Sequence, residues 1–129
     1  MPEEFYVPEL EKIGTQSSDN KQMRTDEQHP EVEIFRGWIR KANVHSFKIY
    51  HDLINNGCPR ELARSVLPVG TYSHMFATAN LHNWFRFLHE RLHIHAQYEI
   101  RVYAEEILKS LETIAPVAVS AFRSSMSEA

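Results

Sequence analysis

Apolar side chains return every three to five residues through most of the segment from Val32 to Ile54, and this helical spacing constrains the fold more than any other sequence feature. The repeating residues are Val32, Phe35, Ile39, Ala42, Phe47, Tyr50, Leu53 and Ile54. Asn56 and Gly57 follow directly, and glycine commonly ends a helix because it tolerates left-handed backbone there. The pattern therefore predicts one long amphipathic helix that begins near Glu31 and stops at Gly57.

Proline and asparagine mark the starts of two further helices. Pro59 suits a first helical position, and Pro68 disfavours helical backbone in the residue before it, so a short helix is predicted over residues 59–66. Asn80 is a residue type that caps helix N-termini. The apolar residues after it follow the spacing i, i+3, i+4, i+7 and i+11: Leu81, Trp84, Phe85, Leu88 and Leu92. They predict the core-facing side of a third helix.

Apolar residues continue at helical spacing toward the C-terminus, whereas the composition of residues 70–79 is typical of a strand. A fourth helix that runs until Pro116 is predicted by Tyr98, Val102, Ala104, Ile107, Leu108 and Leu111. A short apolar tail follows at residues 117–122. Residues 70–79 carry β-branched and aromatic side chains at both ends, which favours an extended strand.

The N-terminal residues 1–30 are polar and, apart from a short extended piece at residues 5–7, show neither helical nor alternating periodicity. We expect an extended segment and a polar loop there. Residues 31–129 are expected to form the helical part of the same single domain. The predicted fold class is therefore α+β and mostly helical.

The composition excludes several classes of protein. The 129 residues, 43% of them hydrophobic, suit one small domain with a modest core. A net charge of -3 provides no overall basic field that would attract nucleic acid or an anionic membrane. Cys58 is the one cysteine, so no intramolecular disulfide can form, and no apolar run is long enough to span a bilayer. We therefore expect a cytoplasmic protein with neither a nucleic-acid nor a membrane partner.

The candidate binding groups cluster around the third predicted helix. A guanidinium is always charged and offers a planar fork of donors, so Arg64 and Arg91 suit a phosphate or the carbonyl edge of a pyrimidine. A period of 3.6 residues places Arg91 on one flank of the apolar stripe together with Asn80 and Phe87. The other flank carries His82, Arg86, His89 and His93. Two different ligands could therefore border one core.

The same region resembles the C-terminal half of the flavin-dependent thymidylate synthases. The matching pieces are Pro59-Arg60-Glu61-Leu62-Ala63-Arg64, Val66-Leu67-Pro68, Thr71-Tyr72, Asn80-Leu81-His82-Asn83, Phe87-Leu88, Arg91 and His95-Ala96-Gln97-Tyr98-Glu99-Ile100. The signature of this family, an Arg-His-Arg followed by a Ser and an Asn-Glu pair, does not occur in the sequence. We therefore expect the chain to be the C-terminal portion of the family's fold.

The resemblance implies a reaction and a set of site residues. The family converts dUMP to dTMP with FAD as cofactor and with methylenetetrahydrofolate and NADPH as co-substrates. By similarity, Arg64 and Arg91 contact dUMP, and Arg91 is also catalytic because it helps to ionise the uracil ring. The FAD contacts carried over from the family are Asn80, Leu81, His82 and Arg86. Family members are homotetramers, so a homo-oligomer is expected, and this chain alone is expected to supply only part of the site.

Two alternatives from other classes stay open. His89-Glu90-Arg91-Leu92-His93 satisfies H-E-x-x-H, in which two histidines one helical turn apart bind zinc and the glutamate activates water. A chain with eight histidines can match three fixed positions by chance, and no third ligand is evident downstream, so we assign no metal ligand. The first alternative is thus a non-catalytic helical interaction module, and the second is a zinc hydrolase.

Overall fold

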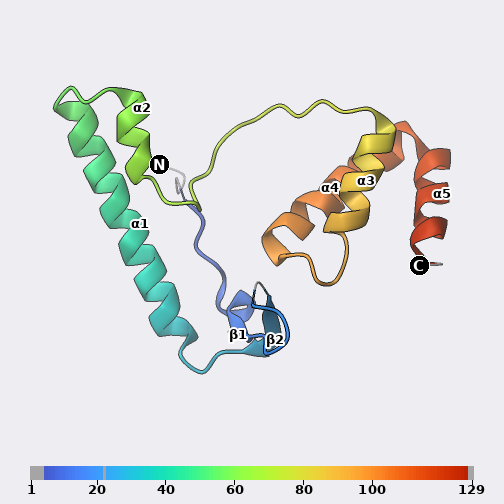
Figure 1. The fold of residues 1–129 in the computed structure, drawn as a ribbon, viewed down its shortest axis with the longest axis horizontal. Coiled ribbons are helices and arrows are strands. Elements are labelled where there is room, and N and C mark those ends of the chain that lie inside the picture. Colours follow the sequence, from blue (N-terminus) through green and yellow to red (C-terminus); the bar gives the residue numbers. More distant parts are fainter. Residues whose placement is uncertain (1–4, 22, 128–129) are drawn as a thin grey trace. The chain divides into compact units, whose positions relative to one another are not determined.

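The computed structural model describes residues 5–21 and 23–127, and its contacts divide the chain into two compact units, Met1–Met75 and Phe76–Ala129 (Figure 1). The first unit contains η1 (Leu10–Lys12), β1 (Gly14–Gln16), β2 (Arg24–Gln28), α1 (Val32–Asn55), α2 (Arg60–Ala63) and η2 (Arg64–Val66). The second contains α3 (Leu81–Arg91), α4 (Tyr98–Ile114) and α5 (Pro116–Ser127). The mostly helical α+β class is confirmed. The expected boundary between residues 1–30 and 31–129 stays a prediction, and the contacts separate the chain at Met75 instead.

Strands β1 and β2 pair as an antiparallel hairpin within the predicted polar loop, so that prediction is wrong for residues 14–16 and 24–28. The hydroxyls of Thr15 and Thr25 are hydrogen-bonded across the hairpin at 2.6 Å. The amide of Gln16 donates to the carbonyl of Met23 at 3.0 Å and so closes the turn. At Gly14 an added Cβ would lie 1.8 Å from the carbonyl oxygen of Thr25, so only glycine fits. Polar cross-strand contacts hold this pair together, and for that reason apolar alternation does not reveal it.

The long helix and its end match the prediction from the sequence. Helix α1 runs from Val32 to Asn55 and is followed by Gly57 with φ of 80°. The amide of Cys58 donates to the carbonyl of Leu53 at 2.9 Å, and the amide of Gly57 donates to the carbonyl of Ile54 at 3.0 Å. These two bonds form the Schellman motif that typically ends a helix at glycine.

The N-terminal residues of the first unit pack along α1. The rings of Phe5 and Phe47 lie 5.4 Å apart, and the buried Asn43 donates from Nδ2 to the carbonyl of Tyr6 at 3.3 Å. Arg36 Nε donates to the carbonyl of Pro8 at 3.0 Å. None of the helices in the described residues, the 24-residue α1 included, combines the length and the apolar character needed to cross a bilayer.

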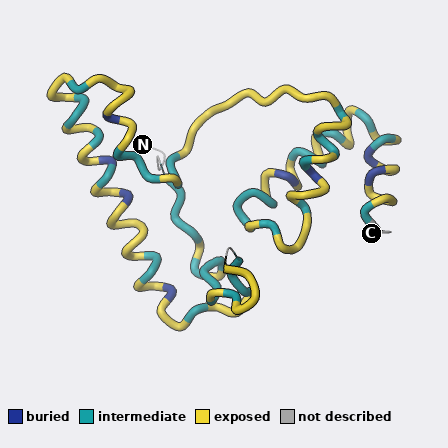
Figure 2. The backbone as a smooth tube through the Cα atoms, viewed as in Figure 1, coloured by how far each residue is buried: buried dark blue, intermediate teal, exposed yellow. Residues whose placement is uncertain are grey.

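The segment between the two units departs from the predicted strand. Thr71 forms an isolated antiparallel bridge with Phe5, and the amide of Tyr6 donates to the carbonyl of Gly70 at 2.7 Å. Residues 72–80 have no regular structure, and all of these residues are exposed (Figure 2). Residues with high strand propensity form a strand only when they can pair with a neighbouring strand. Within the described residues no strand pairs with 72–79, so the strand prediction is wrong there.

Three helices form the second unit around a small core. Leu88 of α3, Ala104 of α4 and Phe122 of α5 are buried together, and the rings of Phe85 and Phe122 are stacked at 4.8 Å with 5° between their planes. Helices α3 and α4 confirm the predicted third and fourth helices. The predicted apolar tail is instead the helix α5, which begins with Pro116, a residue favoured at first helical positions.

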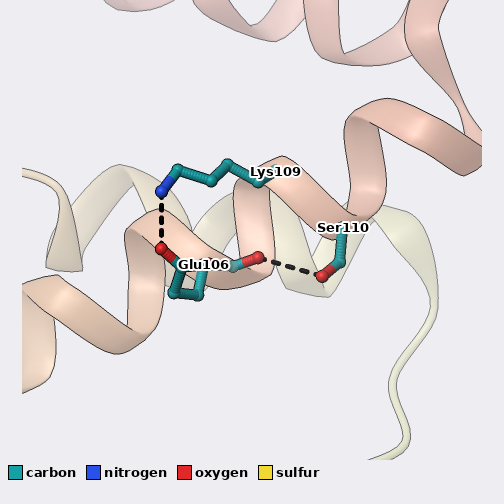
Figure 3. A network of polar contacts seen from close by, with 3 residues as sticks. All are labelled: Glu106, Lys109 and Ser110. Atoms are coloured by element: carbon teal, nitrogen blue, oxygen red, sulfur yellow. Dashed lines mark hydrogen bonds and ion pairs between the residues drawn. The ribbon is translucent and has the colours of Figure 1, made fainter.

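The exposed face of α4 carries a small polar network (Figure 3). Lys109 Nζ donates to Glu106 Oε1 at 2.5 Å, and Ser110 Oγ donates to the carbonyl of Glu106 at 3.0 Å. The hydrogen bond and the charge of Glu106 raise the pKa of Lys109, and Glu105 adds to the effect. The stabilisation linked to the charge of Lys109 is present at neutral pH and is lost as pH rises through its raised pKa. Both side chains are 65% exposed, so the contribution is small.

Candidate functional site

An open depression of about 540 Å³ lies on the second unit, where α3 and α5 meet. Its wall on α3 includes His82, Arg86, His89 and Glu90, and its wall on α5 includes Phe122 and Ser125. His82 and Arg86 are two of the four residues expected to contact the cofactor. They lie four positions apart on α3, which places both side chains on one flank of the helix. The structure therefore brings these two residues to one site.

The apolar lining of this depression, its floor, packs against the core of the second unit. The stacked rings of Phe85 and Phe122 join α3 to α5, and Leu88 beneath them is fully buried. The rim carries the charge. His89 Nδ1 lies 3.7 Å from Glu90 Oε1, and the two side chains are 55% and 75% exposed. The site thus combines a fixed apolar floor with solvated donor groups, which is the usual composition of small-molecule sites.

Asn80 and Leu81 form the start of α3. Asn80 Oδ1 accepts a hydrogen bond from the amide of Asn83 at 2.9 Å, which confirms the predicted N-cap. Leu81 is the first helical residue and is half-buried. Because a helix N-terminus carries a partial positive charge, the neighbouring His82 stands where anionic groups are favoured.

Arg91 is the last residue of α3 and is exposed. Five positions separate it from Arg86, which corresponds to a rotation of about 140° around the helix axis. Arg91 lies on the same side as Trp84, seven positions earlier, whose ring meets that of Phe87 edge-on at 5.9 Å. The expected substrate residue and the expected cofactor pair therefore occupy two different flanks of one helix.

Arg64 belongs to the first unit. It follows α2 and begins η2, its side chain is exposed, and its carbonyl accepts a hydrogen bond from the amide of Leu67 at 3.1 Å. Arg91 belongs to the second unit. The two arginines expected to contact dUMP are thus described on separate units, each with an exposed guanidinium.

The H-E-x-x-H motif does not form the helical pair of histidines that zinc hydrolases use. Helix α3 ends at Arg91, so His93 lies in the turn that follows. There His93 Nδ1 accepts a hydrogen bond from the amide of His95 at 3.2 Å, and the two rings lie 4.9 Å apart. Among the residues that the structure describes, no three His, Cys, Asp or Glu side chains gather as metal ligands would.

The α5 wall is the part of the depression that the sequence interpretation missed. Val119 and Phe122 are buried and Met126 packs against the core, at the spacing i, i+3 and i+7. This spacing is a helical signal, although it is short and lies beyond a proline. It could have predicted that the apolar tail returns to the core as a helix, but not that it would face the flank of His82 and Arg86.

Comparison with known proteins identifies the family of this chain. The family described as thymidylate synthase complementing protein matches residues 1–117. A flavin-dependent thymidylate synthase of Treponema denticola is 40% identical over 122 residues, which cover 92% of this chain and 46% of the relative. Proteins with the same name from Dictyostelium discoideum and Gluconobacter oxydans are 37% and 38% identical, and the matches cover 95% and 92% of this chain.

The chain spans less than half the length of these relatives, with 40% and 41% of the latter two covered. The match nevertheless includes α1 to α4 and every residue expected to contact substrate or cofactor. The resemblance noted in the sequence is therefore confirmed, and the chain belongs to the thymidylate synthase complementing protein family.

Proposed function

We propose that this chain supplies part of the dUMP and FAD sites of a flavin-dependent thymidylate synthase. The enzyme would convert dUMP to dTMP and use methylenetetrahydrofolate and NADPH as co-substrates. One observation carries the proposal: in a chain of this family, α3 presents Arg91 on one flank and the pair His82 and Arg86 on another. One helix could then hold substrate and cofactor on either side of a common core.

Arg91 is proposed as the catalytic residue. Guanidinium groups carry a positive charge in proteins, and the last turn of α3 holds the backbone of Arg91. A fixed positive charge beside the uracil ring stabilises the negative charge that develops when the ring ionises. The ring of Trp84 provides an apolar surface on the same flank, next to Phe87, which also lines the depression. Arg64 is proposed to bind dUMP as well, as a forked donor for its phosphate.

The flavin side of the proposal rests on the depression. Its volume of about 540 Å³ falls within the range of small-molecule sites, and its rim offers donors from His82 and Arg86. Asn80 and Leu81 would place the start of α3 against the cofactor. When bound, reduced FAD would supply the hydride and mediate transfer of the methylene carbon. The chain's own residues would bind and orient the cofactor.

The proposal extends to assembly. Because the relatives are more than twice as long as the matched segments, the other groups of the site would come from the part of the family's length that this chain does not cover. A homotetramer in the cytoplasm is the proposed form of the complete enzyme. We therefore expect the 129-residue chain alone to form no dTMP.

An arginine substitution tests the proposed chemistry. The chain is mixed with the N-terminal half of a complete relative, and dUMP affinity and dTMP formation are measured by calorimetry and a tritium-release assay. Arg91→Ala should lower turnover by about 30- to 1000-fold, which corresponds to about 2 to 4 kcal/mol of lost transition-state stabilisation. Arg123→Ala is the control, because Arg123 pairs with Glu112 on the surface at 2.9 Å and is not among the residues expected to contact substrate or cofactor. Unchanged dUMP affinity together with normal turnover would refute the role of Arg91.

The same assay tests the claim that the chain holds only part of the site. dTMP should form in the mixture and not with the 129-residue chain alone. Robust dTMP formation by the chain alone would show that all catalytic groups lie within it. Absence of activity in the mixture, with flavin and dUMP binding both absent, would refute the proposed function.

A further inference from the structure

Three donor side chains form a row along the rim of the depression. His82, Arg86 and His89 are spaced four and three residues apart on α3, so Arg86 stands one helical turn from each histidine. The row covers about 10 Å of helix length, given a rise of about 1.5 Å per residue. All three side chains are exposed and can turn toward a common ligand. His89 has no role in the proposed function so far.

The floor below this row is already filled. The rings of Phe85 and Phe122 stack on each other with only 5° between their planes, and Phe122 is 8% exposed. One face of each ring is therefore covered by the other, so a planar ligand ring cannot insert between them. An anionic group could instead reach all three donors at the rim. Arginine and histidine donors of this kind suit phosphate oxygens.

A carboxylate at the same rim opposes an anion. Glu90 Oε1 lies 3.7 Å from His89 Nδ1, and its side chain is 75% exposed. The carboxylate repels a phosphate that approaches the same nitrogen. Substitution of Glu90 therefore provides a second test of the site. Removal of its charge should raise the affinity for a bound anion, whereas removal of the His89 side chain should lower it.

We infer that the depression between α3 and α5 binds the phosphate or diphosphate group of a flavin nucleotide, and that His89 is a binding residue there beside His82 and Arg86. The inference rests on the proposed function, since it names which part of the cofactor this site holds. The chemistry shared by all candidate ligands is a phosphate group. Free diphosphate could supply it as well, and the experiment separates the two sources.

The test compares flavins that differ only in their phosphate. The 129-residue chain is titrated with FAD, FMN and riboflavin, and binding is followed by flavin fluorescence. FAD and FMN should bind more tightly than riboflavin. His89→Ala should weaken FAD and FMN binding about three- to tenfold and leave riboflavin binding unchanged, as expected for loss of one charge-assisted hydrogen bond at an exposed site. Glu90→Gln should tighten FAD and FMN binding.

Controls separate a binding role from a structural one. His45→Ala removes an exposed histidine of α1, in the other unit, and should change none of the three affinities. His89→Lys places a cationic donor at the same position and should recover phosphate-dependent binding. Circular dichroism of each variant should match the wild type, because the side chain of His89 is 55% exposed and its loss removes no core contact.

The outcomes distinguish the inference from the proposed function. Equal affinity for riboflavin, FMN and FAD, with no effect of His89→Ala, would overturn the phosphate assignment and leave the flavin proposal standing. Binding of none of the three flavins, alone or with the N-terminal half of a relative, would overturn both. Tight binding of inorganic diphosphate that depends on His89, without any flavin binding, would show a phosphate site that does not serve a flavin.

Discussion

At the scale of single residues, Asn80 combines a structural contact with a proposed ligand role. Its Oδ1 accepts the amide of Asn83 at 2.9 Å and caps α3. The flavin contact is the proposed role. The two can be separated, because serine caps a helix as well as asparagine does but lacks the side-chain amide group.

A pair of substitutions at Asn80 therefore makes the first prediction. Asn80→Ala should lower the free energy of unfolding by about 0.5 to 2 kcal/mol, since the cap is lost, and Asn80→Ser should leave it nearly unchanged. Urea unfolding followed by circular dichroism measures both. If Asn80→Ser keeps the stability but weakens FAD binding, the side-chain amide contributes to the cofactor site. Equal stability of the Ala variant and the wild type would contradict the capping role.

The second prediction concerns two glycines of the first unit, whose replacement by alanine should change stability in opposite directions. Gly57 has φ of 80°, so Gly57→Ala should destabilise the end of α1 by about 1 kcal/mol or more. Gly37 lies inside α1 with nothing within 4 Å of an added Cβ. Gly37→Ala should therefore stabilise α1 by about 0.5 to 1 kcal/mol, because alanine loses less backbone entropy in a helix. Chemical denaturation checks both, and effects of the same sign would refute this account.

At the scale of elements, α5 determines whether the α3 flank becomes a site. It supplies the second wall of the depression, and its contact with α3 runs through the stacked rings of Phe122 and Phe85. Val119 of the same helix is fully buried. The geometry of the depression should therefore depend on α5 remaining docked.

Removal of one ring tests this dependence. Phe122→Ala should destabilise the second unit by about 3 to 5 kcal/mol, the usual cost of deleting a buried phenylalanine. Val117→Ala, on the same helix and 84% exposed, should change stability by less than about 0.5 kcal/mol. Thermal unfolding compares the two. If Phe122→Ala were as stable as Val117→Ala, α5 would not be docked as described.

At the scale of the whole molecule, two compact units are joined by an exposed segment. Residues 72–80 form no helix or strand, and within them Phe76 is fully exposed and Tyr72 is 53% exposed. Backbone of this kind, without regular hydrogen bonds, is where proteases cut first.

Limited proteolysis provides the fourth prediction. Chymotrypsin should cut first after Tyr72 or Phe76 and release two fragments that resist further digestion for longer. Mass spectrometry identifies the sites. The double variant Tyr72→Ser, Phe76→Ser should be cut more slowly, while the aromatic residues within α3 and α5 stay protected by packing. An initial cut after Phe85 or Phe122 would show that the second unit is not compact.

Local chemistry determined a large part of this protein. The end of α1 at Gly57 and the start of α3 at Asn80 follow from backbone preferences and caps that involve only a few neighbouring residues. The helical spacing also determined that His82 and Arg86 share a flank that Arg91 does not. The family resemblance came from the same residues, and the family match confirms it.

The tertiary structure decided what depends on distant partners. Polar cross-strand contacts pair residues 14–16 with residues 24–28, although no apolar alternation in the sequence predicts these strands. Residues 72–79 have strand-like composition but meet no strand among the described residues, so the same propensity yields no strand there. Helix α5 becomes a wall of the candidate site only because Phe122 stacks on Phe85. Pairing and burial need a second surface, and its position is not encoded in a local pattern of residues.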